Sequence, residues 1–393
     1  MIKRHNFSKF IAASSFTTSD AHNEFFLTIN VPSNTSFTKA LDNLYSNYTK
    51  ALKKLELNVT TQVFCRFYLS DISNQKSSLL SSKIYKFCQN GAYSVIQQCP
   101  LGVGSVSLLA YHISQKTKRK SKKVFRFDDE KWRNGVKVEG INYDIFCTAN
   151  FSGFGSLDSF EQTNEIFDSY NSFLNSNDMT LIKNVVRTWL YIRDIDNHYS
   201  GMVDSRREYF TEQGLTKETR FIASTGIEGK SKEVNSLVSM DALALTRLNP
   251  SQIIRMEALE NLNPTHEYGV TFERGARIEF GDRSHLFISG TASIDKHGQV
   301  TNTSDIRKQA KRVLENIEAL LRPHKAGLKD MAYFIVYFRN ITEIEKVKEV
   351  LAQEKLNDIP TIFVEGSVCR PTWLVEMEGI GIIPENNSWP KFA

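Results

Sequence analysis

The chain has 393 residues and a formal net charge of +5 at pH 7, with 41% hydrophobic and 24% charged residues. This length exceeds one ordinary domain core and the composition is that of a globular protein, so two or three packed domains are expected rather than a disordered or fibrous chain. The charge is mildly basic and is not gathered into the basic stripe typical of nucleic-acid binders. The one dense basic run, KTKRKSKK at residues 116–123, is interpreted as a solvated loop or edge, with a polyphosphate or nucleic-acid contact as the alternative.

The five cysteines form no CxxC pair, so neither a disulfide framework nor a zinc site is indicated, and a reducing cytoplasm is expected. No signal peptide is predicted, and no window approaches the ~20 apolar residues of a membrane span. His285 and His297 are expected in loops, and the eight histidines show no ligand spacing. Because common cofactor and metal motifs are also missing, neither a metal nor a cofactor is predicted.

In chain order, the first predicted unit opens with an amphipathic helix at residues 38–54, where apolar side chains recur at helical spacing. A strand at 63–69 follows and ends in a polar turn at Asp71. A further apolar strand at 106–112 closes the unit.

The same order of elements occurs twice more. The second copy has a helix, a strand, a turn and a closing strand at 158–174, 186–192, Asp194 and 238–244. The third copy has them at 306–321, 332–338, Asn340 and 375–381. We therefore expect three modules, at residues 1–115, 124–249 and 265–393. Since a sheet covered by helices on one face must bury its other face, the modules are expected to close around a pseudo-threefold axis.

The third module resembles a RidA/YjgF-family domain. The matching segments are LFISGTASIDKHGQV at 286–300, the helix QAKRVLENIEALL, the strand DMAYFIVYF and the closing WLVEMEGIGI. The middle module matches less closely and the first only weakly. The resemblance implies an α+β fold of repeated, chorismate-mutase-like modules. Each would have a mixed sheet with two helices on one face, in a pseudo-trimeric arrangement with pockets between modules.

The last two thirds of the chain is similar to the chorismatases, two-domain relatives of RidA. The matching segments, in order, are VVRTWLYI, SRREYF, ASTGI, YGVTFERG, SGTASI and VCRPTWLVEME. Chorismatases remove the enolpyruvyl side chain of chorismate as pyruvate and yield 3-hydroxybenzoate or a dihydroxycyclohexadiene carboxylate. The resemblance implies the same activity here, on a small dianionic substrate and without a cofactor.

Glu376 is the predicted catalytic residue. It alternates with Val375 and Met377 on the closing strand, so it projects from the opposite face. The other closing strands have Ser107 and Ser239 at this position, which suggests one working pocket and two inert ones. The alternative is a solvated or ion-paired sheet glutamate. An acid that protonates the enol ether methylene must stay protonated near neutral pH, so burial should raise its pKa.

Further pocket residues are expected from the resemblance and from the two carboxylates of chorismate, which call for arginines in fork geometry. Each has an ordinary core or surface interpretation as the alternative. Cys369 is associated in that family with 3-hydroxybenzoate formation, and Ala292 is a small residue that could influence the product. The expected substrate-binding set is Cys369, Arg206, Arg220, Tyr199, Thr225, Gly226, Arg274 and Ala292, with Arg370 as a further arginine and with Thr225 and Gly226 in a turn.

Two other functions remain open from the sequence. A RidA-type enamine or imine deaminase would carry an arginine near Ile362 or Ser224, and neither position is basic. A non-catalytic ligand- or RNA-binding protein is the other possibility, supported only by the run at 116–123. No membrane or nucleic-acid partner is expected, and the protein would act as a monomeric pseudo-trimer or a homo-oligomer.

Overall fold

The computed structural model describes residues 1–18, 22–115, 122–126, 133–155, 158–233 and 235–392. Within this part of the chain, the strands form three six-stranded sheets. All three follow one strand order, β1-β2-β3-β6-β4-β5, β7-β8-β9-β12-β10-β11 and β13-β14-β15-β18-β16-β17. In each sheet the last pair in that order is parallel and the other pairs are antiparallel. The predicted α+β fold of three repeated modules is confirmed.

The elements of each module follow one another in a similar order. In the first module they are β1 Ile2–Ser8, β2 Ile11–Phe16, β3 His22–Ile29, α1 Phe37–Lys54, β4 Gln62–Leu69, α2 Ile72–Ser81, α3 Lys83–Cys88, β5 Ala92–Gln97 and β6 Val106–Gln115. In the second they are β7 Lys122–Arg126, β8 Asn134–Val138, β9 Ile145–Ser152, α4 Ser159–Asn175, α5 Leu181–Asn184, β10 Val185–Ile192, α6 Ile195–Glu212, β11 Ala223–Glu228 and β12 Val238–Leu245. In the third they are β13 Ile253–Arg255, β14 Gly275–Glu279, β15 Arg283–Ala292, α7 Ile306–Leu321, β16 Met331–Phe338, α8 Ile344–Gln353, β17 Thr361–Glu365 and β18 Val375–Pro384.

Local sequence accounts for the principal helices. The apolar stripe of α1 is buried, and the Ser36 side chain caps its first turn. Asp158 and Glu161 form a capping box at the start of α4. The turn residues Asp71 and Asp194, predicted to end strands, are also the N-cap residues of α2 and α6.

Three expectations need correction. The third sheet begins at Ile253, before the expected module start at 265, because β13 pairs with β14. His285 lies inside β15, where it is buried and within hydrogen-bond distance of Glu24 at 2.9 Å. The ASTGI segment is strand β11 rather than a turn. Apolar partners from neighbouring strands decide these assignments, and single-sequence patterns do not reveal them.

Most of the basic run lies outside the described residues, which omit 116–121. Lys122 and Lys123 begin β7. The Lys122 ammonium donates to the backbone oxygens of Val59 and Gln62, at 2.6 and 3.1 Å, and burial lowers its pKa to about 8. This end of the run is therefore tied to the first module rather than solvated.

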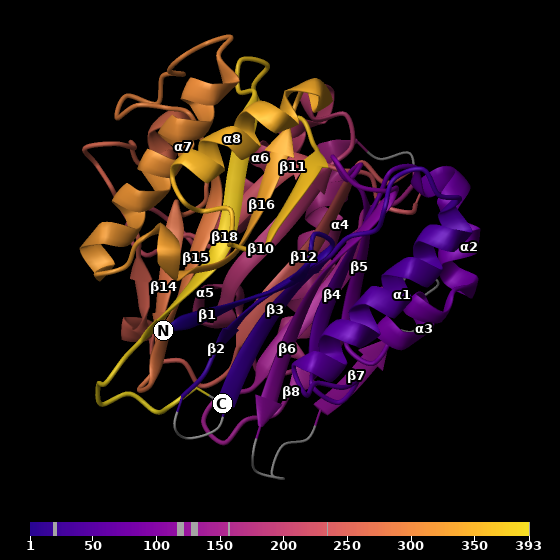
Figure 1. The fold of residues 1–393 in the computed structure, drawn as a ribbon. Coiled ribbons are helices and arrows are strands. Elements are labelled where there is room, and N and C mark those ends of the chain that lie inside the picture. Colours follow the sequence, from indigo (N-terminus) through magenta and orange to yellow (C-terminus); the bar gives the residue numbers. More distant parts are fainter. Residues whose placement is uncertain (19–21, 116–121, 127–132, 156–157, 234, 393) are drawn as a thin grey trace.

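The helices lie on the outside and the three bare sheet faces meet in the middle, as Figure 1 shows for the first and third modules. A continuous apolar core runs through all three modules, and each module boundary contains a buried arginine–carboxylate pair. These pairs are Arg66–Asp241 between the first and second modules, Arg187–Glu378 between the second and third, and Arg283–Glu24 between the third and first. Such pairs act as registration points, because a charge left alone there would be costly.

Among the described helices, none combines the length and the apolar character that crossing a membrane requires.

Candidate active site

A cavity lies between the second and third modules. The space free of protein atoms is about 540 Å³, part of which opens to solvent, and this is the scale of a small-molecule site. The second module contributes α6 and β11, and the third contributes the segment before β14, the end of β15, the loop before β18 and β18 itself. The structure brings eight of the nine predicted site residues to this cavity: Glu376, Cys369, Arg206, Tyr199, Thr225, Gly226, Arg274 and Ala292. Arg370 also lines it.

Glu376 is held by β18, and its side chain lines the cavity. It is only 5% exposed, and it pairs with Ala292 on one side and Tyr337 on the other. Its carboxyl makes no hydrogen bond to any described residue. Burial raises the pKa of Glu376 to about 8, with help from the charge of Glu378, while Arg274 and Arg187 act in the opposite direction. The carboxyl is therefore largely protonated at neutral pH and can serve as an acid.

Space for this carboxyl comes from Gly290. The register of β15 against β18 shifts between Ile288 and Thr291, so Gly290 lies in a β-bulge beside Glu376. A Cβ atom added at Gly290 would lie 2.1 Å from Glu376 Oε1. Any other residue would push the carboxyl aside, so the glycine is a requirement of the site rather than of its backbone angles.

Two arginines approach the cavity from different modules. The guanidinium groups of Arg206, on α6, and Arg274, just before β14, lie 5.8 and 5.7 Å from the ring centre of Phe272. Arg274 is additionally held by Asn263, donating to its backbone oxygen at 3.1 Å. Both arginines are buried, at 2% and 7% exposure. The cavity wall can therefore present fixed positive charge to an anionic ligand.

Arg220 was expected in this set, and the structure places it elsewhere. Its guanidinium donates to the backbone oxygens of Ile182, Leu181 and Val185, at 2.8, 3.3 and 2.7 Å. It therefore satisfies the carbonyl groups at the end of α5, which the helix leaves without partners. The expectation for Arg220 is wrong because an arginine that binds backbone carbonyls looks, in sequence, the same as one that binds a substrate.

Cys369 lies in the loop before β18 and Tyr199 on α6. Burial and the neighbouring charge of Glu376 raise the pKa of the Cys369 thiol to about 12, although a hydrogen bond with Tyr199 opposes this. The thiol is therefore protonated at neutral pH and is not a ready nucleophile. Its contribution to a reaction would be through its size and polarity.

The register of the strands establishes which positions of the modules correspond. Glu376 pairs with Tyr337, Ser239 pairs with Tyr191 and Ser107 pairs with Tyr68. The predicted equivalence of Glu376 with the two serines therefore holds. The same register makes Ile362 the counterpart of Thr225 rather than of Ser224. Ile362 and Ser224, the two positions at which a deaminase arginine was sought, are therefore offset by one residue.

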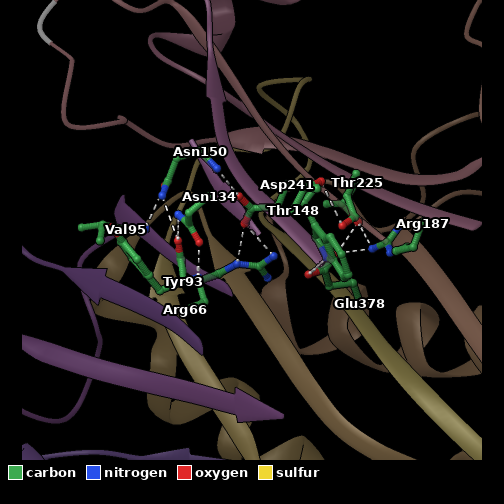
Figure 2. Close-up of polar contacts among 12 residues, drawn as sticks. Arg66, Tyr93, Val95, Asn134, Thr148, Asn150, Arg187, Thr225, Asp241 and Glu378 are labelled. Atoms are coloured by element: carbon green, nitrogen blue, oxygen red, sulfur yellow. Dashed lines mark hydrogen bonds and ion pairs between the residues drawn. The ribbon is translucent and has the colours of Figure 1, made fainter. Parts of the chain in front are cut away.

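Sequence reasoning did not identify Glu378, a buried carboxylate next to the cavity residues. Glu378, two residues after Glu376, pairs with Arg187 and also accepts hydrogen bonds from Trp189, Thr225 and Tyr337 (Figure 2 shows the Arg187, Thr225 and Glu378 side). One signal was present. The alternation in VEMEG places a second carboxylate on the same face as Glu376, within an otherwise apolar strand.

Comparison with known proteins supports this architecture. Residues 279–383 match the family described as Endoribonuclease L-PSP. A 3-hydroxybenzoate synthase of Streptomyces hygroscopicus is 27% identical over 222 residues, covering 50% of this chain and 63% of that protein. The chain thus spans somewhat less than two thirds of the length of this relative.

Two further likenesses define the family and the fold. A crystal structure of a chorismatase superposes with a TM-score of 0.60 at 16% identity, covering 93% of this chain and all of the other, which shows a shared fold. A RutC family protein of Pyrococcus abyssi is 33% identical over 96 residues, covering 24% of this chain and 76% of that protein. Through its third module, the chain belongs to the RutC family, part of the RidA/YjgF group.

Proposed function

We propose that the protein removes the enolpyruvyl side chain of chorismate as pyruvate, with Glu376 as the general acid. The observation that carries this proposal is a carboxyl that is buried, neutral near pH 7 and open to a cavity lined by arginines. The 27% sequence identity with a 3-hydroxybenzoate synthase, over 50% of this chain, supports the choice of substrate.

Glu376 would protonate the terminal methylene of the enol ether. The resulting oxocarbenium ion is then captured by water or by a neighbouring hydroxyl of the ring. Capture by water leads through a hemiketal to pyruvate and a dihydroxycyclohexadiene carboxylate. Internal capture, followed by loss of pyruvate and aromatisation of the ring, yields 3-hydroxybenzoate. Both routes balance without a redox partner, and the acid recovers its proton when the product forms.

The remaining cavity residues would position the ring. Arg206 and Arg274 would neutralise the two carboxylates of chorismate, because guanidinium groups form paired hydrogen bonds to carboxylates. Cys369 and Ala292 lie on the same cavity and would influence which nucleophile captures the cation. By the family resemblance, Cys369 favours 3-hydroxybenzoate as the product.

The test is to mix purified protein with chorismate, follow pyruvate with a coupled dehydrogenase and identify the ring product by chromatography. Replacing Glu376 by Gln keeps the shape of the side chain but removes the acid, so we expect pyruvate release to fall by roughly 10²–10⁴-fold. Ser239→Ala, a change at the equivalent position of the second module, is the matched control and should leave the rate intact. If the unaltered protein releases no pyruvate from chorismate, the proposal is wrong.

The pH dependence gives a second check on the role of Glu376. The protonated carboxyl is the active form and its pKa is raised to about 8, so the rate should hold through neutral pH and fall as the pH rises past 8. If Glu376 acted as a base, the rate would instead rise over the same range.

A further inference from the structure

Glu378 is the most heavily bonded carboxylate next to the proposed site. One of its oxygens, Oε2, accepts from Arg187 Nη2 and Thr225 Oγ1. The other, Oε1, accepts from Trp189 Nε1 at 3.0 Å and from the Tyr337 hydroxyl at 2.9 Å. The side chain is 1% exposed. Its oxygens are thus compensated by four donors, one of them the Arg187 guanidinium.

Arg187 is committed to this group. Its Nη2 atom also donates to Thr225 Oγ1 at 2.6 Å, and its guanidinium lies 4.8 Å from the ring centre of Trp189. Thr225 Oγ1 in turn accepts from the backbone N–H of Gly290 at 2.9 Å. The network thus joins β10, β11 and β18 to the bulge of β15 that makes room for Glu376.

Glu376 has no such partners. It lies two residues from Glu378 on the same strand face, a separation of about 7 Å along the strand. None of the described cationic groups lies within ion-pair distance of it, and its carboxyl makes no hydrogen bond to any of them. Two carboxyls therefore share one buried region, and Arg187, which lies between the modules there, is paired with Glu378. Under these conditions the unpartnered carboxyl is the one that keeps its proton.

We propose that Glu378 is a positioning residue whose fixed negative charge keeps the neighbouring Glu376 carboxyl in its neutral, proton-donating form. This inference rests on the proposed role of Glu376 as the acid. It adds a second function for the contact between the modules, because the donors that hold Glu378 come from the second module as well as the third.

The other groups around Glu376 do not duplicate this effect. The segment before β14 contributes Arg274, α6 contributes Tyr199 and Arg206, and the loop before β18 contributes Cys369 and Arg370. Of these groups, Arg274 lowers the pKa of Glu376, so its effect opposes that of Glu378. Among the charges of the described residues that act on Glu376, that of Glu378 has the largest effect, and it raises the pKa.

The experiment compares Glu378→Gln with the unaltered protein by ¹³C NMR titration of glutamate labelled at the side-chain carboxyl. The Glu376 signal is identified by its loss in Glu376→Gln. Glutamine keeps the size of Glu378 and removes its charge, so we expect the pKa of Glu376 to fall by at least one unit. The high-pH decline of pyruvate release should move down by the same amount. An unchanged pKa in Glu378→Gln overturns the inference.

Two variants separate charge from structure. Glu378→Asp keeps the charge, introduces the residue type present at the equivalent position 241, and should leave the pKa within half a unit. Asp241→Asn breaks the equivalent ion pair with Arg66 in the second module, so it disturbs the fold in a similar way but should not move the pKa. A fall of one unit in either variant would show a general structural effect and would contradict the inference.

If Glu378→Gln does not fold, the double variant Arg187→Met/Glu378→Gln removes both partners and leaves no unpaired charge. The pKa should still fall, because the charge of Glu378 acts on Glu376 more strongly than that of Arg187. The titration needs no substrate. A shifted pKa therefore supports this inference even if chorismate is not turned over, whereas pyruvate release with an unmoved pKa supports the proposed function and overturns the inference.

Discussion

A β-bulge lies at the boundary between the first and second modules, and an equivalent β-bulge lies between the second and third. The two bulges serve different purposes. In β9 the register shifts between the pairs formed by Met240 and Ala242, which places Asn150 in a bulge equivalent to that of Gly290 in β15. Asn150 donates to the backbone oxygen of Tyr93 at 2.8 Å and accepts from the N–H of Val95 at 3.2 Å. At this boundary an amide fills the space that the other boundary leaves open (Figure 2).

The ion pairs behind the two bulges extend the comparison. Asp241 and Glu378 occupy equivalent positions on their closing strands, and each pairs with an arginine of the preceding module. Asp241 also accepts from the N–H of Asn150 at 3.1 Å. At the equivalent place in the third module, the N–H of Gly290 donates to Thr225 instead. One framework therefore holds an amide at one boundary and borders the Glu376 cavity at the other, and a few side chains decide between the two outcomes.

The largest expected effect comes from giving the bulge beside the cavity the residue found in the bulge of the second module. Gly290→Asn copies the residue of the second module, and its side chain would meet the Glu376 carboxyl, since a Cβ atom there lies 2.1 Å from Oε1. We expect pyruvate release to fall by about 10³-fold, the scale of losing a general acid. Coupled pyruvate assays measure this. Activity within fivefold of the unaltered protein would show that the bulge does not define the site.

Next in size is the loss of a buried ion pair at the boundary between the first and second modules. Arg66→Met leaves Asp241 charged and buried without its partner, which should cost about 3–5 kcal/mol in the free energy of unfolding. The double variant Arg66→Met/Asp241→Leu should recover most of this loss, because no charge is stranded. Urea unfolding followed by circular dichroism measures both. Equal destabilisation of the single and double variants would contradict this account.

A smaller effect is expected from Asn150 itself. Asn150→Ala removes both bonds to β5 and leaves a residue without a side-chain amide at a φ of 60°, so we expect a loss of roughly 2 kcal/mol. Asn150→Gly should cost less, since glycine adopts this φ freely. Thermal unfolding of the two variants tests the order, and a glycine variant less stable than the alanine variant would be evidence against it.

The smallest effect is the change in the free energy of unfolding when the pH rises by one unit. The pKa of Glu376 is raised from 4.5 to about 8, so between these values the folded protein keeps a proton that the unfolded chain loses. Stability relative to Glu376→Gln should therefore fall by roughly 1.4 kcal/mol for each unit of rising pH, and remain level below 4.5 and above 8. Denaturant titrations at pH 5, 6 and 7 measure the slope. Parallel curves for the two proteins would indicate an ordinary pKa.

Much of the fold follows from local patterns. The stripe of α7 predicts the helix at Ile306–Leu321, and the alternation in β18 predicts which face Glu376 occupies. These features could be predicted because helical and strand periodicities act over a few residues. The sites of Arg220 and His285 could not, because their partners lie on segments whose position depends on packing.

By itself, the sequence determined the three repeated units, their helices and strands, and the position of the one carboxyl that replaces a serine in the closing strands. Only the tertiary structure decided which bulge borders the Glu376 cavity, because both bulges require strands far apart in the chain to pair. It also decided the electrostatics of the cavity. Arg187 reaches Glu378 across 191 positions of sequence, and a charge acts over distance in space, not along the chain.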